Sequence, residues 1–87
     1  MSVKKSQIQL KKDIEHYLST ANRGNRFRVI FIPDGLVRTQ MIRFGIMEGE
    51  ILKCIERLPG GTILIQKNRQ EIAIGLKLAE QIKVIPI

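Results

Sequence analysis

The sequence predicts a mainly β fold, a small five-stranded barrel with short helices and an added N-terminal α-helix. Five short apolar segments of strand length follow one another between Phe27 and Ile87, and turn-forming residues separate them. Short strands in so small a chain bury their apolar faces best when the sheet closes on itself, which favours a barrel. The 87 residues suffice for one domain with a small core.

The N-terminal segment from Ser6 to about Ala21 has the apolar spacing of a helix. Its apolar residues recur at steps of seven, four, three and four, and so form one stripe: Val3, Leu10, Ile14, Tyr17 and Ala21. The loop at residues 22–25, with a glycine inside it, marks the end of this helix. We expect residues 1–23 to form a basic amphipathic helix and residues 24–87 to form the barrel domain.

We expect the five strands at residues 27–32, 50–58, 62–67, 70–74 and 82–87. The first is apolar on both faces apart from Arg28, so one face is expected to meet the core and the other the N-terminal helix, with water on neither. The turn signals are Pro33-Asp34-Gly35, Pro59-Gly60-Gly61 and the two-residue loop Asn68-Arg69. Gly75 is expected to mark a bulge or a close approach of two backbones.

Two short helices are expected at residues 37–44 and 76–80. The first should bury one side, made by Val37, Met41, Ile42 and Phe44. Gly45 stands where the end of a helix needs a residue of positive φ, and Gly49 stands where a tight turn needs one before the chain extends. The stretch from residue 40 to residue 52 therefore reads as one compact helix-turn-strand unit, and no catalytic group is needed to explain it.

The net charge of +7 is concentrated in the first third of the chain. This third contains only two acidic residues, Asp13 and Glu15. Its seven cationic residues are Lys4, Lys5, Lys11, Lys12, Arg23, Arg26 and Arg28. Such a segment suits nucleic acid or an anionic membrane surface, or simply keeps a small domain soluble. The single cysteine excludes a disulfide scaffold and agrees with a reducing compartment. No apolar run approaches the roughly 20 residues of a membrane-spanning helix, so we expect a soluble cytoplasmic protein without membrane insertion.

The residue types that carry chemistry are too sparse for an active site. His16 has only Asp13 within one helical turn, short of the ligands that a zinc-type site needs. Cys54 alternates with apolar neighbours and is expected to be a small buried hydrophobe. Glu48 and Glu50 flank Gly49 and could approach one cation, but no third ligand accompanies them. We therefore expect that the protein is not an enzyme and has no catalytic residues. The sequence does not identify the ligands of any metal ion.

Two segments resemble the signatures of the FeoA family. Residues 40–49, QMIRFGIMEG, are similar to Arg-Leu-x-x-hydrophobic-Gly-Ile-x-x-Gly, and residues 72–84, IAIGLKLAEQIKV, are similar to Ile-Ala-Leu-Arg followed by Ala and Ile-x-Val. The resemblance covers roughly residues 24–87 and implies an SH3-like barrel, as in the C-terminal domain of iron-dependent repressors. Gln40 and Gly75 replace the family's Arg, Glu48 replaces a common Pro, and Arg43 replaces a usual acidic residue.

The resemblance implies a non-enzymatic accessory protein that supports or regulates ferrous iron uptake by binding the cytoplasmic domain of a FeoB-like transporter. We expect the short helix and its exit turn to carry the contact, through five side chains that should be exposed: Arg38, Gln40, Arg43, Met47 and Glu48. Met41 and Met47 flank Gly45, where core filling competes with partner binding. No cofactor is required, although the resemblance leaves weak binding of a transition metal, Fe²⁺, open.

Two other functions stay open. A basic SH3-like module can bind nucleic acid, which is the less favoured partner, with an affinity that falls steeply as salt rises. Alternatively, the chain forms a homo-oligomer. Either the apolar stripe of Leu10, Ile14 and Tyr17 or an exposed edge strand at residues 82–87 would then pair between copies.

Overall fold

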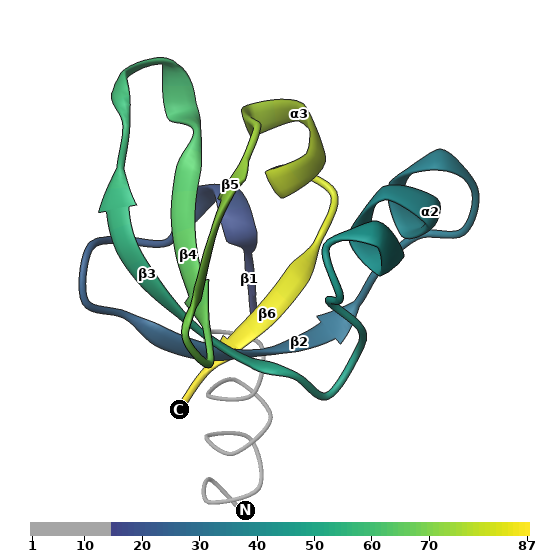
Figure 1. Ribbon diagram of the computed structural model, residues 1–87, viewed down its shortest axis with the longest axis horizontal. Helices are drawn as coiled ribbons and strands as arrows, with labels where there is room; N and C mark the ends of the chain where they lie inside the picture. The colour runs from purple at the N-terminus through teal and green to yellow at the C-terminus, as the bar shows by residue number, and fades with distance from the viewer. Residues whose placement is uncertain (1–14) are drawn as a thin grey trace, which may run out of the picture.

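The computed structural model describes residues 15–87, which form one curled antiparallel sheet with four short helical segments around it (Figure 1). The strands are β1 (His16–Tyr17), β2 (Arg26–Phe31), β3 (Ile51–Arg57), β4 (Ile63–Lys67), β5 (Gln70–Ile74) and β6 (Lys83–Pro86). The helical segments with labels in the figure are α2 (Leu36–Arg43) and α3 (Leu76–Ala79), and two 3₁₀ turns lie at Leu18–Thr20 and Pro59–Gly61.

The strand order is β1-β6-β2-β3-β4-β5. The sheet curls around the core as a small barrel does, but no pairing joins β1 to β5 within residues 15–87, so this barrel is open. The predicted mainly β class, with short helices on a small barrel, is confirmed. β6 lies between β1 and β2, so the expectation that residues 82–87 form an edge strand is wrong.

Apolar side chains alone form the interior of the described chain. They come from the strands, from the helical segments and from the loops beside them, and the largest fully buried ones include Leu18, Ile32, Met41, Ile46, Leu52, Ile63, Ile65, Ile74 and Ile82. Each such side chain stabilises the fold by about 1.5–3 kcal/mol relative to an exposed one. No polar or charged side chain of residues 15–87 is buried.

The predicted N-terminal helix is wrong for residues 16–20. His16 and Tyr17 form β1, which pairs with Val84 and Lys83 of β6, and a 3₁₀ turn follows. The helical stripe predicts that Tyr17 is buried, but Leu18 is the buried residue and Tyr17 is exposed. The Leu18 N–H donates to the Ile82 carbonyl at 2.8 Å, so backbone pairing with β6 fixes this segment. The remainder of that prediction, with Leu10 and Ile14, lies outside the described residues.

A bulge in β2 changes which side chains face the core. The pairing of β2 with β6 shifts register between Val29 and Phe31, so Ile32 is buried and Phe31 is about half exposed. The expectation that neither face of this segment meets water is therefore wrong. Lys83 sits between two exposed rings in the neighbouring strands, with its Nζ 5.9 Å from the Tyr17 centroid and 5.8 Å from the Phe31 centroid.

The predicted turns are confirmed at residues 33–35, 59–61 and 68–69, and Asn68 has a φ of 55°. Gly75 forms no bulge: its φ of −64° and ψ of 156° are ordinary extended values, and it precedes α3 as its N-cap. A Cβ built on Gly75 would meet no atom within 4 Å, so no second backbone approaches it closely either.

Candidate partner-binding surface

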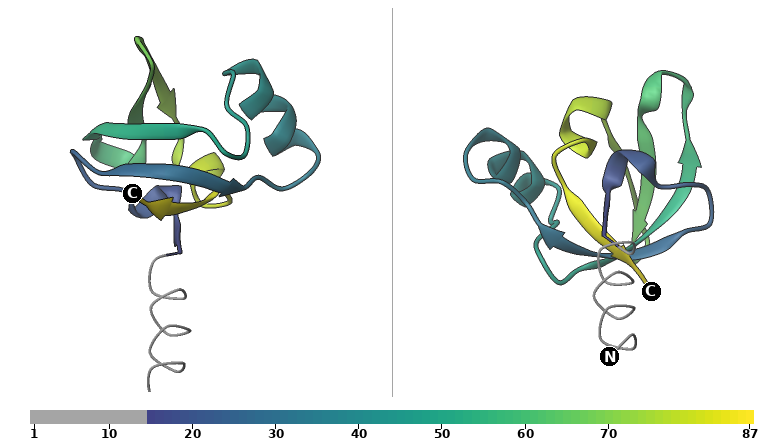
Figure 2. Two further views of the ribbon diagram at one scale, coloured as in Figure 1. Left: turned by 90° about the horizontal axis from the view of Figure 1, so that it is seen from below. Right: turned by 180° about the vertical axis from the view of Figure 1, so that it is seen from behind.

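α2 and the segments on either side of it form an arm, residues 33–50, that projects from the sheet between β2 and β3 (Figures 1 and 2). Val37 and Met41 attach α2 to the core, and Phe44 packs against it, as the sequence predicts. Ile42 is 52% exposed, so its assignment to the buried side is wrong. The helix therefore keeps only a narrow apolar stripe on the core and turns its other faces outward.

The end of α2 is a Schellman cap centred on Gly45. The Gly45 N–H donates to the Ile42 carbonyl and the Ile46 N–H to the Met41 carbonyl, both at 2.9 Å. Gly45 has a φ of 77°, the left-handed value that this motif requires. Ile46 and Met41 are both fully buried, which supplies the apolar contact that accompanies the cap. The sequence signal at Gly45 is therefore confirmed.

Gly49 returns the arm to the sheet. It has a φ of 92°, and its N–H donates to the Val29 carbonyl at 2.8 Å, while the Val29 N–H donates to the Glu50 carbonyl at 3.0 Å. These two bonds continue the pairing of β2 with β3 up to the turn. The arm thus begins at the end of β2 and ends beside the middle of the same strand.

Arg38 and Glu48 form an ion pair that closes the arm, and we call this pair the arm clamp. The Arg38 guanidinium donates to both carboxylate oxygens of Glu48, with Nη1 3.1 Å from Oε1 and Nη2 bonded to Oε2. Nη2 also donates to the Ile32 carbonyl at 2.6 Å, and Nε donates to Asp34 Oδ1 at 3.1 Å. The Ile32 N–H donates to Glu48 Oε2 at 3.2 Å. One guanidinium therefore joins the end of β2, the helix and the exit turn.

The clamp changes the pKa of both partners. The hydrogen bond from Arg38 is the main cause that lowers the pKa of Glu48 to about 2, and backbone N–H donors act in the same direction. The same hydrogen bond raises the pKa of Arg38 above its ordinary value. Both groups therefore stay charged at neutral pH, and the clamp persists there.

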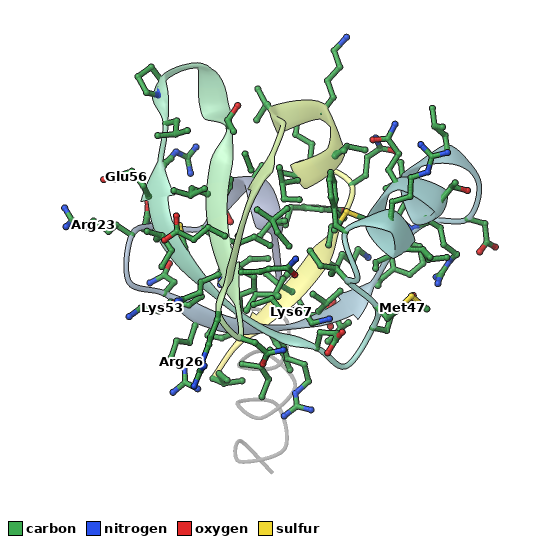
Figure 3. The ribbon with its side chains drawn as sticks, viewed as in Figure 1. Arg23, Arg26, Met47, Lys53, Glu56 and Lys67 are labelled. Atoms are coloured by element: carbon green, nitrogen blue, oxygen red, sulfur yellow. The ribbon has the colours of Figure 1, made fainter. Side chains whose placement is uncertain are left out.

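A second ion pair holds the exit of the arm from the other side. Lys67, at the end of β4, pairs with the Glu50 carboxylate at 2.5 Å and donates to the Gly45 carbonyl. In Figure 3 the Lys67 side chain lies between the strands and Met47 of the arm. Sequence reasoning missed Lys67, since only the long-range pairing of β3 with β4 brings it to this place.

The five residues expected at a partner surface divide into two groups. Arg38 and Glu48 bind each other, and Arg38 and Gln40 are half-buried, so the expectation that all five side chains are exposed is wrong for these two. Arg43 and Met47 are exposed as expected. Sequence reasoning missed Leu36, which is 73% exposed, because it lies before the predicted start of the helix. We call the exposed set of Leu36, Ile42, Arg43 and Met47 the arm surface.

The other candidates form no site. His16 lies on the edge strand and lines an open hollow with Asn25 and Arg26, and no Asp or Glu side chain is part of the described lining. Cys54 is fully buried, and this burial raises the pKa of its thiol, as expected of a small core hydrophobe. Glu48 and Glu50 bind two different cations of the chain. Within residues 15–87 there is no cluster of three or more His, Cys, Asp or Glu suited to a metal ion.

Two further findings limit the class of protein. Among the residues that the structure describes, no helix is both long enough and apolar enough to span a membrane. An open six-stranded barrel with a clamped helical arm defines a small SH3-like module. The sequence matches the family model of the FeoA domain over residues 16–86, and the chain therefore belongs to the FeoA family.

Solved structures agree with this assignment. A crystal structure of an iron uptake regulatory protein, FeoA, has a TM-score of 0.77 at 27% identity and covers 84% of this chain and 99% of its own. The solution structure of FeoA from Chlorobium tepidum has a TM-score of 0.72 at 26% identity, covering 83% of this chain and 70% of its own. Among curated protein sequences none matches this chain.

The fold also occurs inside larger regulators. A manganese-dependent transcriptional repressor has a TM-score of 0.77 at 20% identity, and the match covers 84% of this chain and 42% of that protein. At this identity the similarity concerns the fold alone. The SH3-like barrel that the sequence resemblance implies is thus confirmed.

Proposed function

We propose that this protein is a non-enzymatic, cytoplasmic accessory protein of ferrous iron transport that binds the cytoplasmic domain of a FeoB-like transporter through the arm surface. Membership of the FeoA family supports the link to iron transport. The observation that carries the contact is an arm, held by two ion pairs, that exposes three large apolar side chains, Leu36, Ile42 and Met47. Exposed apolar side chains on a projecting element are typical of protein interaction sites.

In this proposal the clamp residues position the arm and the arm surface makes the contact. Arg38 and Glu48 neutralise each other in an ion pair, so neither side chain offers an unpaired charge to a partner. Arg43 forms no ion pair with the described residues and is free to meet an acidic group of the partner. The replacement of the family's acidic residue by Arg43 would therefore change which partner charge is recognised.

Calorimetric titration against the cytoplasmic domain of a FeoB-like transporter tests this contact. The variant Arg43→Glu/Met47→Asp should lose binding at least about tenfold, because it reverses a charge and places a carboxylate in the apolar contact. The control Lys77→Glu/Ile87→Asp makes the same charge change at exposed residues away from the arm and should bind like wild type. Equal affinity of the two variants would refute the arm surface as the contact.

The proposed function needs no resident cofactor, and direct binding of Fe²⁺ is a separate question. Oxygen-rich clusters are the usual sites of hard divalent cations, and the carboxylates Glu48 and Glu50 are already paired with Arg38 and Lys67. Anaerobic titration of the free protein with Fe²⁺ measures any such binding, and the variant Glu48→Gln/Glu50→Gln shows whether these carboxylates take part in it.

A further inference from the structure

We propose that the outer face of β2 and β3 is a docking surface for an anionic lipid membrane. This inference concerns a different face from the arm and does not depend on the transporter contact. We call it the cationic face, and define it by four exposed cations: Arg23, Arg26, Arg28 and Lys53.

Strand register brings these cations together. Arg26 lies directly opposite Lys53 in the antiparallel pair of β2 and β3, so their Cβ atoms are roughly 5 Å apart on the same face. Arg28 lies two residues along β2, about 7 Å away, on that same face. The buried Phe27 and Leu52 point the other way, into the core. The alternation of the strands therefore fixes all three cations on the outside.

Arg23 joins them from the adjoining loop. The loop is fastened to β3 beside Lys53, because the Gly24 N–H donates to the Cys54 carbonyl and the Cys54 N–H donates to the Asn25 carbonyl, each at 2.8 Å. In Figure 3 the labelled side chains of Arg23, Lys53 and Arg26 all point outward along one margin of the molecule. The cations thus form a continuous group at the surface.

These cations are not neutralised by the described part of the chain. The ion pairs of residues 15–87 involve Arg38 and Lys67 and none of the cationic face. The acidic side chains of Glu56 and Glu71 lie near the face and form no ion pair with it. Glu56 lies beside Arg23 in Figure 3. Lys53 of β3 pairs with Gln66 of β4, and Gln66 pairs with Glu71 of β5, so Glu71 lies two strands away from Lys53. The face therefore keeps a net positive charge and complements an anionic surface.

The side chains between the cations favour a membrane over nucleic acid. Arg28 pairs with Ile51 on one side and with Ile85 on the other, so one row of the face reads isoleucine, arginine, isoleucine. Apolar side chains among cations suit the headgroup region of an anionic bilayer. Two exposed rings, Tyr17 and Phe31, lie beyond Arg28 on the same side of the sheet, on either side of Lys83, and rings among cations also suit the interface of a bilayer. No helix of the described residues lies on this face to enter a groove of double-stranded nucleic acid. Residues 1–14 add four lysines to the sequence just before β1: Lys4, Lys5, Lys11 and Lys12.

Vesicle co-sedimentation of the full chain tests the proposal. Wild type should bind vesicles of phosphatidylcholine with about 30% phosphatidylserine, should not bind pure phosphatidylcholine, and should lose binding as salt rises. The variant Arg26→Gln/Lys53→Gln should bind the anionic vesicles about 10- to 30-fold more weakly, from roughly one membrane-attracted charge lost at each site. The control Lys77→Glu lowers the net charge by the same two units at a residue outside the face and should bind like wild type.

Three results would overturn the proposal. They are binding that does not distinguish anionic from neutral vesicles, equal losses in Arg26→Gln/Lys53→Gln and Lys77→Glu, and anisotropy that shows tight binding of a single- or double-stranded oligonucleotide when anionic vesicles do not bind. Circular dichroism of both variants verifies that the fold is retained. Since no transporter is present in these measurements, their outcome is separate from that of the arm contact.

Discussion

The sheet and the arm of this protein are stabilised by different physical forces. The sheet encloses an interior of apolar side chains, and no polar side chain of the described residues is buried. The sheet is therefore stabilised mainly by the burial of apolar surface, which is a non-directional force. The arm has only three buried side chains, Val37, Met41 and Ile46, and the rest of its attachment consists of hydrogen bonds and ion pairs with fixed geometry. A mutation or a change of pH should therefore affect the two regions in different ways.

The largest contrast is expected for the same substitution in both regions. Ile65→Ala in β4 removes a fully buried side chain and should lower the free energy of unfolding by about 2–5 kcal/mol. Ile42→Ala on the arm removes a side chain that is half exposed and should change it by no more than about 0.5 kcal/mol. Urea denaturation of both variants measures the difference. Similar losses would show that the arm is packed as tightly as the sheet.

A smaller contrast is expected at two glycines. Gly45→Ala places a side chain at a φ of 77° and should cost about 1–2 kcal/mol of stability. Gly75→Ala is the matched control, since its φ of −64° suits any residue and a Cβ there meets no neighbour. Thermal unfolding of the two variants compares them. Equal stability would mean that the cap at Gly45 contributes little to the arm.

The smallest expected effect is the pH dependence of the arm clamp. The pKa of Glu48 is about 2 in the folded protein and near 4.5 in the unfolded chain. A lowered pKa of this kind stabilises the fold fully above the unfolded value, and the contribution is lost as pH falls through about 2. Urea midpoints from pH 7 to pH 2 should show wild type more stable than Glu48→Gln at neutral pH, with the gap closing below pH 4.5. A gap independent of pH would exclude the charge of Glu48 as its cause.

The sequence predicts most of the sheet because its turns carry strong local signals. Gly45, Asn68 and the turn at residues 59–61 lie where left-handed or tight geometry is needed, and few residue types satisfy it. β1 was missed because a strand of two residues has no periodicity of its own, and its hydrogen bonds come from β6. The exposure of Phe31 depends on a bulge, which shifts a period-two pattern by one residue.

The candidate site was less predictable because its main contacts join distant parts of the chain. Arg38 and Glu48 are ten residues apart across a helix and a turn. The sequence predicts both as exposed charges, and only the folded structure shows that they pair with each other. Lys67 reaches Gly45 across 22 residues. Ile42 follows the buried Met41 in sequence, and only the narrow contact of α2 with the core places it outside. Such pairings depend on how the helices and strands pack against one another, and a local sequence pattern carries no information about that packing.

The exposed ring of Tyr17 has a practical consequence. It is the only tyrosine of a chain without tryptophan, and it lies on the short edge strand β1 with the Lys83 ammonium 5.9 Å from its centroid. The tyrosine fluorescence of the native protein therefore comes from one place, the short strand β1 at the start of the described residues. Detachment of β1 from β6 can be followed spectroscopically there, without a dye, a label or an engineered chromophore.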